Sequence, residues 1–147
     1  MEIRDYAGYC HEMSEIARDE CSETAIWQSY IDYTTDKRYE IKPISDREGK
    51  EVGFLIIGKD VRPESHFDYY IAETYIKPKY RKHGYTFKAV KEFIETHKGS
   101  YTLFIINNNT VAKHFWRKVQ NELNLKPIYP LTPCFDDETC TEYGFYT

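Results

Sequence analysis

A basic turn with one glycine joins a predicted strand to a predicted helix near the middle of the chain. Residues Ile71 to Ile76 favour a strand, and helical periodicity begins after Pro78. Backbone N–H groups at a helix start lack partners and carry the positive end of the helix dipole. Five basic or titratable side chains stand in the turn: Lys77, Lys79, Arg81, Lys82 and His83. The turn therefore predicts a phosphate-binding site, with a solvated basic loop as the alternative.

An acid among aromatic side chains is the second candidate for chemistry. Glu73 lies in the predicted strand among Tyr69, Tyr70 and Tyr75, in a chain that contains 14 tyrosines. Apolar surroundings raise the pKa of a carboxyl group, which would let Glu73 accept a proton near neutral pH. The alternative is a salt bridge between Glu73 and a nearby lysine or arginine. The tyrosines could either line a wet cleft or serve mainly as packing surface.

Composition limits the class of protein. The chain has 147 residues, of which 41% are hydrophobic and 30% are charged, so we expect a single domain over residues 1–147. No apolar run approaches the roughly 20 residues that span a bilayer, and the first residues are too polar for a secretion signal. We therefore expect a cytoplasmic protein with no membrane partner.

Charge and metal-ligand spacing exclude further classes. The formal net charge is -4, from 24 acidic and 20 basic residues, which gives no overall attraction to nucleic acid and favours a cationic substrate. No C-x-x-C pair or H-E-x-x-H spacing occurs, so we expect no metal site. The four cysteines are read as free thiols: Cys10, Cys21, Cys134 and Cys140.

Two helices and a hairpin are predicted in the first half of the chain. Apolar residues at helical spacing indicate a helix from Ile3 to Ala17, and a second helix follows from Glu23 to Tyr33 with Ser22 as its N-cap. Arg38 to Ile44 alternates weakly and Val52 to Ile57 is an apolar run typical of a buried strand. The turn residues between them predict a hairpin. A loop from Val61 to Ser65 then leads to a strand from Asp68 to Ile76.

The second half of the chain predicts a crossover between parallel strands. A helical stripe through Phe87, Val90 and Ile94 ends at Lys98-Gly99, and a strand runs from Tyr101 to Ile106. Strand, helix and strand in this order indicate a right-handed βαβ unit and a partly parallel sheet. The remaining elements are a helix from Thr110 to Leu123 with Val111, Phe115, Val119 and Leu123 at a strict spacing of four, an irregular tail at Pro127, Pro130 and Pro133, and a last strand from Glu142 to Tyr146.

Two motifs at this spacing resemble the GNAT superfamily of acetyl-CoA-dependent N-acetyltransferases. Arg81-Lys82-His83-Gly84-Tyr85-Thr86 resembles the family motif Arg/Gln-x-x-Gly-x-Gly/Ala, although Thr86 replaces the small last residue. Leu103 to Ile106, followed by Asn109-x-x-Ala112-x-x-Phe115-Trp116, is similar to the next strand and helix of the family. The matches cover about residues 52 to 123. The run from Ile71 to Gly84, together with Phe115-Trp116-Arg117-Lys118-Val119, resembles a bacterial branch of predicted GNAT proteins.

The resemblance implies both a fold and a reaction. The fold would be a three-layer α/β (α+β) structure, in which helices flank a mixed, mostly antiparallel sheet. Acetyl-CoA would be the cosubstrate, and its acetyl group would pass directly to a primary amine in a ternary complex. By the same resemblance Glu73 would be the catalytic base, and the cofactor-binding residues would be Ile76, Arg81, Lys82, His83, Gly84, Tyr85, Thr86, Asn109, Ala112, Phe115 and Trp116.

Three of these assignments carry particular expectations. The backbone N–H of Ile76 would donate to the attacked carbonyl oxygen, as the corresponding residue does in the family. Asn109 could contact the cofactor or act only as the N-cap of its helix. Trp116 stands where many relatives have a tyrosine that protonates the leaving thiolate. Because indole cannot supply that proton, we expect Trp116 to pack beside the cofactor, and the thiol could leave as a thiolate or be served by another tyrosine.

Two other functions remain open at this point. A non-catalytic acyl-CoA-binding or sensing module would share the fold, and the missing tyrosine favours it. A nucleic-acid-binding domain that uses the basic residues from Lys77 to His83 is disfavoured by the acidic charge of the chain. The acceptor could be a small-molecule or peptide amine, and the protein could assemble as a homodimer.

Overall fold

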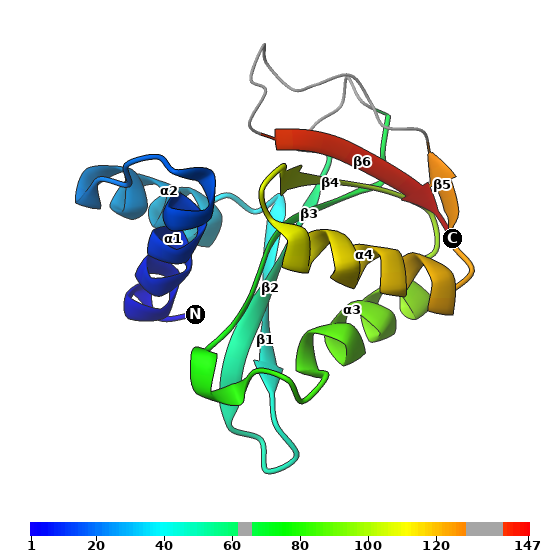
Figure 1. Cartoon of the computed structure of the whole chain (residues 1–147), viewed down its shortest axis with the longest axis horizontal. Coiled ribbons are helices and arrows are strands. Elements are labelled where there is room, and N and C mark those ends of the chain that lie inside the picture. The colour runs from blue at the N-terminus through cyan, green and yellow to red at the C-terminus, as the bar shows by residue number, and fades with distance from the viewer. Residues whose placement is uncertain (62–65, 129–139) are drawn as a thin grey trace.

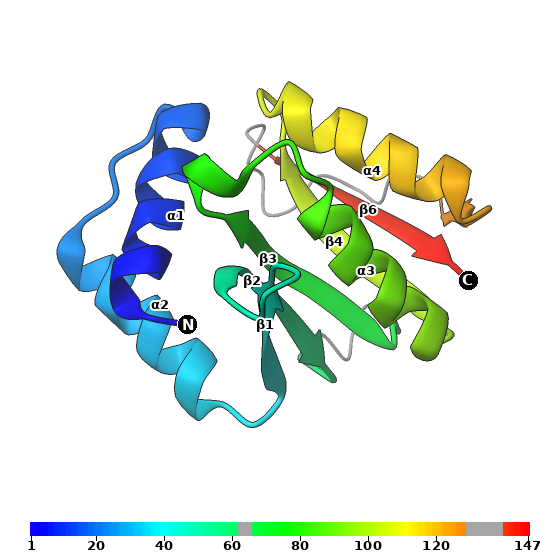
Figure 2. The same ribbon diagram turned by 90° about the horizontal axis from the view of Figure 1, so that it is seen from below.

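A six-stranded sheet with helices on both faces forms the framework of the protein (Figure 1). The computed structural model describes residues 1–61, 66–128 and 140–147. Helices α1 and α2 cover one face of the sheet, and α3 and α4 cover the other (Figure 2). The elements are α1 (Ile3–Ala17), α2 (Glu23–Thr35), β1 (Tyr39–Ser45), β2 (Glu51–Lys59), β3 (Tyr69–Ile76), a 3₁₀ turn (Pro78–Tyr80), α3 (Tyr85–Thr96), β4 (Ser100–Ile106), α4 (Thr110–Glu122), β5 (Lys126–Ile128) and β6 (Cys140–Tyr146).

The sheet is mixed and mostly antiparallel, as the sequence predicted. The strand order is β1-β2-β3-β4-β6-β5, and β3 and β4 are the one parallel pair among its neighbours in the described residues. Helix α3 connects these two strands, which confirms the βαβ unit. The predicted hairpin is the β1–β2 pair, and the expected three-layer α/β architecture is confirmed.

The apolar run of β2 is continuous because both faces of this strand are buried. Leu55 and Ile57 pack into the core under α3 and α4, whereas Phe54 and Ile56 pack into a second core under α1 and α2. Residues that alternate between two apolar layers need no polar position between them. The second core also contains Tyr6, so α1 is packed directly over the strands that carry the candidate chemistry.

The N-terminal helices match their predicted positions closely. Helix α1 has the predicted bounds, and Arg18 in the left-handed region ends it. The Ser22 side chain accepts a hydrogen bond from the Ala25 N–H at 3.1 Å, so its role as N-cap of α2 is confirmed. Helix α2 continues to Thr35, two residues beyond the predicted end.

Other predicted details were wrong. Helix α3 ends at Thr96, before Lys98-Gly99, and the supposedly irregular Pro127 lies in the short strand β5. Val111 does not lie on the buried side of α4, because Val111 is 79% exposed whereas Val119 is buried. A spacing of four advances about 400° around a helix, so the stripe drifts away from the core over three steps. Residues 62–65 of the predicted loop and Pro130, Pro133 and Cys134 lie outside the described residues.

Candidate active site

The two parallel strands separate after a short stretch of pairing. Strands β3 and β4 pair at Tyr69 with Tyr101, Tyr70 with Thr102 and Ile71 with Leu103. Beyond these residues β3 continues to Ile76 and β4 continues to Ile106 without pairing to each other in the described structure. The separation leaves backbone hydrogen-bonding groups facing a gap, which a ligand can use.

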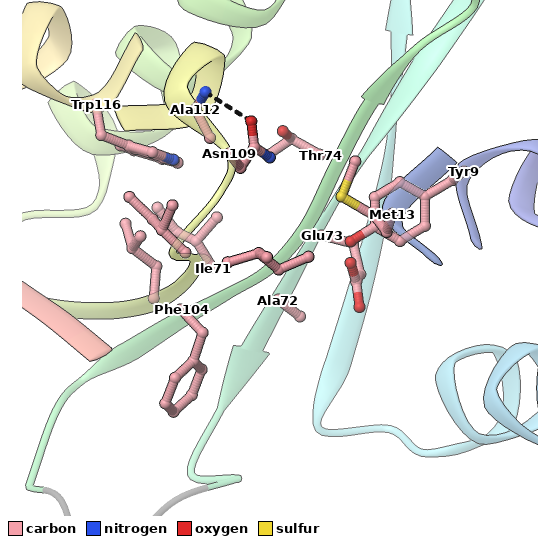
Figure 3. A pocket seen from close by; sticks show the side chains of 13 residues that line it. Tyr9, Met13, Ile71, Ala72, Glu73, Thr74, Phe104, Asn109, Ala112 and Trp116 are labelled. Atoms are coloured by element: carbon pink, nitrogen blue, oxygen red, sulfur yellow. Dashed lines mark hydrogen bonds between the residues drawn. The ribbon is translucent and has the colours of Figure 1, made fainter. Parts of the chain in front are cut away.

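A cavity of about 130 Å³ occupies the inner end of this gap (Figure 3). Side chains from β3, β4, α4 and α1 surround it, and the acidic member is Glu73. Figure 3 shows Glu73 beside Tyr9 and Met13 of α1, with Asn109 and Trp116 of α4 on the opposite side. The described lining contains no lysine, arginine or histidine, so this end of the gap suits a neutral or cationic group.

A larger pocket of about 570 Å³ continues from this cavity toward the start of α3. The two share five lining residues: Met13, Thr74, Asn109, Ala112 and Trp116. All the residues predicted to bind a cofactor line the larger pocket: Ile76, Arg81, Lys82, His83, Gly84, Tyr85, Thr86, Asn109, Ala112, Phe115 and Trp116. The sequence matches therefore describe one continuous surface, with Glu73 next to it in the smaller cavity.

The turn before α3 has the geometry of an anion site. Gly84 is the N-cap residue, with φ of 75°, and Lys82 also has a positive φ of 68°. Gly84 has no heavy atom within 4 Å of the place where a Cβ would lie, so the backbone is open to the pocket. The first N–H groups of α3 have no partner within the helix. Among the described residues Arg81, Lys82, His83 and Lys118 line the pocket against one acid, Glu12, which favours an anionic ligand.

Arg81 is held by other parts of the chain. Its Nε donates to the Ile76 carbonyl at 2.9 Å, and its Nη2 lies 2.6 Å from Oε2 of Glu12 on α1. The guanidinium also lies over the Tyr75 ring, 5.5 Å from its centroid. Arg81 thus braces the basic turn against α1 and β3, and the backbone N–H groups and the neighbouring Lys82 remain directed to the pocket.

The N–H of Ile76 faces the gap. The next residue, Lys77, donates its N–H to the Val52 carbonyl of β2 at 2.9 Å. Consecutive N–H groups of a strand point to opposite sides, so the N–H of Ile76 points away from β2 toward β4. This is the direction that the predicted carbonyl contact requires.

Asn109 serves as a cap and also lines the pocket. Its Oδ1 accepts a hydrogen bond from the Ala112 N–H at 3.0 Å, which confirms it as the N-cap of α4. The amide nitrogen points toward the β3 side of the gap (Figure 3). The two readings of Asn109 are therefore compatible, because the cap uses one end of the amide and leaves the other at the pocket.

Trp116 packs against two aromatic rings. Its ring contacts Phe115 edge-on, with centroids 5.1 Å apart, and lies 6.2 Å from the ring of Phe145. It also lines both the cavity and the larger pocket. The indole is thus a partly buried wall that joins the two spaces.

A bulge in β3 decides where Glu73 points. Ile56 of β2 pairs with Glu73 and Ile57 pairs with Ile71, so Ala72 is an extra residue on β3. Ile71 packs into the core under α3 and α4, whereas Ala72 and Tyr75 pack under α1 and α2. Because a bulge shifts the alternation by one residue, Glu73 also faces α1 and α2.

The surroundings of Glu73 make it a weak acid. Tyr33 of α2 donates a hydrogen bond to Oε1 of Glu73 at 3.0 Å. Burial raises the pKa of Glu73 to about 8, although the residue keeps part of its surface exposed. Among the described residues no lysine or arginine forms an ion pair with it, so the salt-bridge alternative has no partner there. A carboxyl group in this state can accept a proton near neutral pH.

Sequence reasoning missed several parts of the site. It placed aromatic residues of β3 around Glu73, but Tyr69 packs on the other face and the closest phenol comes from Tyr33. It also missed Tyr9, Glu12 and Met13, which α1 places along the two spaces. The helical spacing of α1 indicated a buried face but carried no signal about which strand that face would meet.

Among the described residues no group of three or more histidine, cysteine, aspartate or glutamate side chains could hold a metal ion. None of the described helices is long and apolar enough to cross a membrane. Cys10 and Cys21 are free thiols, and Cys140 begins β6.

Comparison with known proteins identifies the family of this site. Residues 9–121 match the acetyltransferase (GNAT) family, whose members use acetyl-CoA. No curated protein matches the sequence. An acetyltransferase structure from Thermus thermophilus has a TM-score of 0.69 at 15% identity, and the match covers 100% of this chain and 94% of that one.

Two further solved structures share the fold at low identity. A phosphinothricin acetyltransferase from Sinorhizobium meliloti, in complex with AcCoA, has a TM-score of 0.61 at 12% identity over 100% of this chain and 84% of its own. A chimeric spermidine N-acetyltransferase from Vibrio cholerae and hSSAT has a TM-score of 0.59 at 13% identity over 99% of this chain and 91% of its own. The parted strands, the left-handed basic turn and the family match lead to one conclusion: the chain belongs to the acetyltransferase (GNAT) family and is an acyltransferase.

Proposed function

We propose that this protein transfers an acetyl group from acetyl-CoA to a primary amine by direct transfer in a ternary complex. The observation that carries the proposal is the continuity of two spaces, one basic at the α3 turn and one containing Glu73. We further propose that residues 1–147 act as one domain, since a match over 100% of the chain also covers 94% of the Thermus thermophilus structure.

The residues of the larger pocket fit acetyl-CoA. The open backbone at Gly84 and the N–H groups of the first turn of α3 would bind the diphosphate, with Lys82 and His83 beside them. Asn109, Ala112, Phe115 and Trp116 would line the pantetheine arm along the gap between β3 and β4. When bound, acetyl-CoA supplies the thioester whose acetyl group is transferred. The N–H of Ile76 would donate to the thioester carbonyl oxygen as negative charge develops there.

Glu73 would act as the general base. A free aliphatic amine has a pKa near 10.4, so it is almost wholly protonated at neutral pH and cannot attack. The raised pKa of Glu73, about 8, matches this carboxylate to the task of accepting the amine proton. The leaving thiol has an ordinary pKa near 8.5, so it can depart as a thiolate without a tyrosine at the position of Trp116.

The acceptor class follows from the charges of the smaller cavity. Its described lining has one carboxylate and no basic side chain, which supports an amine that enters as a cation. Solved structures of the same fold include acetyltransferases for spermidine and for phosphinothricin. We therefore propose an aliphatic amine as the acceptor.

The alternative is a non-catalytic module that binds acyl-CoA. The presence of Trp116 in place of the tyrosine of many relatives favours it, since the thiolate would lack a proton donor. Thermal-shift titration with acetyl-CoA, followed by release of free thiol with a panel of amines, separates the two functions. Stabilisation together with amine-dependent thiol release supports the acetyltransferase. Stabilisation without release from any amine supports the binding module, and no stabilisation overturns both.

A further inference from the structure

We propose that Tyr33 of α2 is a positioning residue that holds one oxygen of the Glu73 carboxylate and directs the other toward the acceptor. The proposal rests on the proposed function, because Tyr33 acts on catalysis only through Glu73. The two residues are 40 positions apart in the sequence and meet across the interface of α2 and β3.

The direction of the Tyr33 phenol is fixed by the rings around it. The Tyr33 ring meets Tyr39 of β1 edge-on, with centroids 4.8 Å apart at 89°. It also meets Tyr6 of α1 edge-on, with centroids 6.0 Å apart at 79°. Both contacts are of the kind that aromatic rings prefer, so the hydroxyl is held at the position from which it donates to Glu73.

The hydrogen bond uses one oxygen of the carboxylate. Tyr33 donates to Oε1 at 3.0 Å, and among the described residues it is the hydrogen-bond partner of this side chain. Glu73 itself lies in the wall of the smaller cavity beside Tyr9 and Met13 (Figure 3). A carboxylate held through Oε1 has Oε2 available to an ammonium group in the cavity.

The charge on Glu73 depends on this donor. A hydrogen bond to a carboxylate favours its charged form and opposes the effect of burial. Burial also raises the pKa of Tyr33 above its ordinary value, so the phenol remains a donor at working pH. The titratable groups around the pair carry no positive charge: Tyr6, Tyr9 and Cys10 on α1, Asp32 on α2, Tyr39 on β1 and Tyr70 on β3.

Removal of the hydroxyl should therefore raise the pKa of Glu73 further. In Tyr33→Phe we expect the midpoint of Glu73 titration to move up by about one pH unit, because burial stays while the donor is lost. Turnover at pH 7 should fall about tenfold, in proportion to the smaller charged fraction, and should recover toward the wild-type value at high pH. The Michaelis constant for acetyl-CoA should stay within about twofold, since Tyr33 lines neither pocket.

The direct test is ¹³C NMR titration of the glutamate side-chain carboxyl groups in the protein without ligand, with Glu73 assigned from Glu73→Gln. The matched control is Tyr30→Phe, which removes a phenol one turn earlier on the same helix. The Tyr30 hydroxyl donates to the Met1 carbonyl at 3.1 Å, so its loss should leave the Glu73 midpoint unchanged. An unchanged midpoint in Tyr33→Phe overturns the proposal.

A measurement on the native chain covers the case in which Tyr33→Phe does not fold. The ¹³Cζ resonance of Tyr33 should titrate with the Glu73 midpoint in the native protein, and this titration should disappear in Glu73→Gln. A Tyr33 resonance that does not titrate with the Glu73 midpoint would show that Tyr33 does not contact Glu73.

Activity separates this proposal from the function on which it rests. A loss of turnover in Glu73→Gln but not in Tyr33→Phe overturns the role of Tyr33 alone. Full turnover in Glu73→Gln would show that Glu73 is not the catalytic base, and Tyr33 would then have no base to position.

Discussion

Glu73 combines two opposing influences on one carboxyl group. Its burial beneath α1 and α2 disfavours the charged form, whereas the hydrogen bond from Tyr33 favours it. Burial raises the pKa of Glu73 to about 8, between that of an ordinary glutamate and that of an amine. A base with this pKa is partly charged at neutral pH, and its proton affinity is closer to that of an amine than the proton affinity of an ordinary glutamate is.

We expect Glu73→Gln to lower turnover about a hundredfold or more, because the amide keeps the shape of the side chain but cannot accept a proton. The wild-type rate should rise with pH, with a midpoint near 8, and the variant should lack this rise. Steady-state thiol release from pH 6 to 9.5 measures both. Calorimetric affinity for acetyl-CoA, expected within about twofold of wild type, is the control. An unchanged rate and pH profile would remove Glu73 from the mechanism.

Trp116 lines the site with its aromatic surface, and its indole cannot donate a proton in the reaction. We expect Trp116→Phe to retain most of the activity, within about fivefold, since phenylalanine preserves an aromatic surface beside Phe115. Turnover with a saturating amine measures the effect, and circular dichroism checks folding. A hundredfold loss in a folded variant would show that the indole has a direct role in the reaction.

At the scale of an element, the start of α3 has a backbone that few residues adopt. Gly84 has φ of 75°, a left-handed conformation that costs other residues about 1–2 kcal/mol. No neighbouring atom requires a glycine there, because the space around its Cβ position is open. The conformation directs the first N–H groups of the helix outward, and an anion can approach them closely.

Replacement of Gly84 by glutamate should abolish detectable binding of acetyl-CoA. The side chain would place bulk and negative charge where we propose that the diphosphate binds, and like charges in a partly desolvated site repel by several kcal/mol. Because φ of Gly84 is 75°, we also expect a loss of about 1–2 kcal/mol in unfolding free energy.

The chain supplies a matched control in Gly49. This glycine has φ of 83°, with no heavy atom within 4 Å of its Cβ position, and it lies in the turn between β1 and β2. Gly49→Glu should lose similar stability but retain affinity for acetyl-CoA. Calorimetric titration with parallel urea unfolding makes the comparison. A folded Gly84→Glu that binds as tightly as Gly49→Glu would show that the turn does not hold the diphosphate.

At the scale of the whole molecule, the sheet divides two apolar layers, and Glu73 lies in one of them. Its folded-state pKa of about 8 exceeds the ordinary value of 4.5. Between these values the unfolded chain has released the proton that the folded protein keeps, so stability falls as pH rises. The cost is complete above pH 8, when the buried group is also charged.

Glu73→Gln should remove this dependence. We expect the unfolding free energies of the variant and the wild type to agree most closely at pH 4.5, and the variant to gain about 1–3 kcal/mol in relative stability by pH 9. This value is smaller than the full pKa shift implies, because Glu73 keeps part of its surface exposed. Urea unfolding of both proteins at pH 4.5, 7 and 9 measures the difference. A difference that stays constant across this range would contradict the buried-carboxyl account.

The amino-acid sequence alone determined most of the elements and the residues that line the larger pocket. Local periodicity predicted the helices, because each helix depends on residues within a few turns of one another. The order strand, helix and strand predicted the βαβ unit. The motif from Arg81 to Thr86 and the helix start at Asn109 predicted residues that line one pocket. These residues lie at the ends of neighbouring elements. Because the chain links those elements directly, their ends must lie close together.

Only the tertiary structure decided the surroundings of the reacting groups. The face of Glu73 depends on the extra residue Ala72, and a one-residue shift in strand alternation leaves no trace in composition or periodicity. The Tyr33 hydroxyl reaches Glu73, and Glu12 reaches Arg81, through the packing of α2 and α1 on the sheet. Such contacts join residues 40 and 69 positions apart, and they depend on helix placement, which no local pattern of residues specifies.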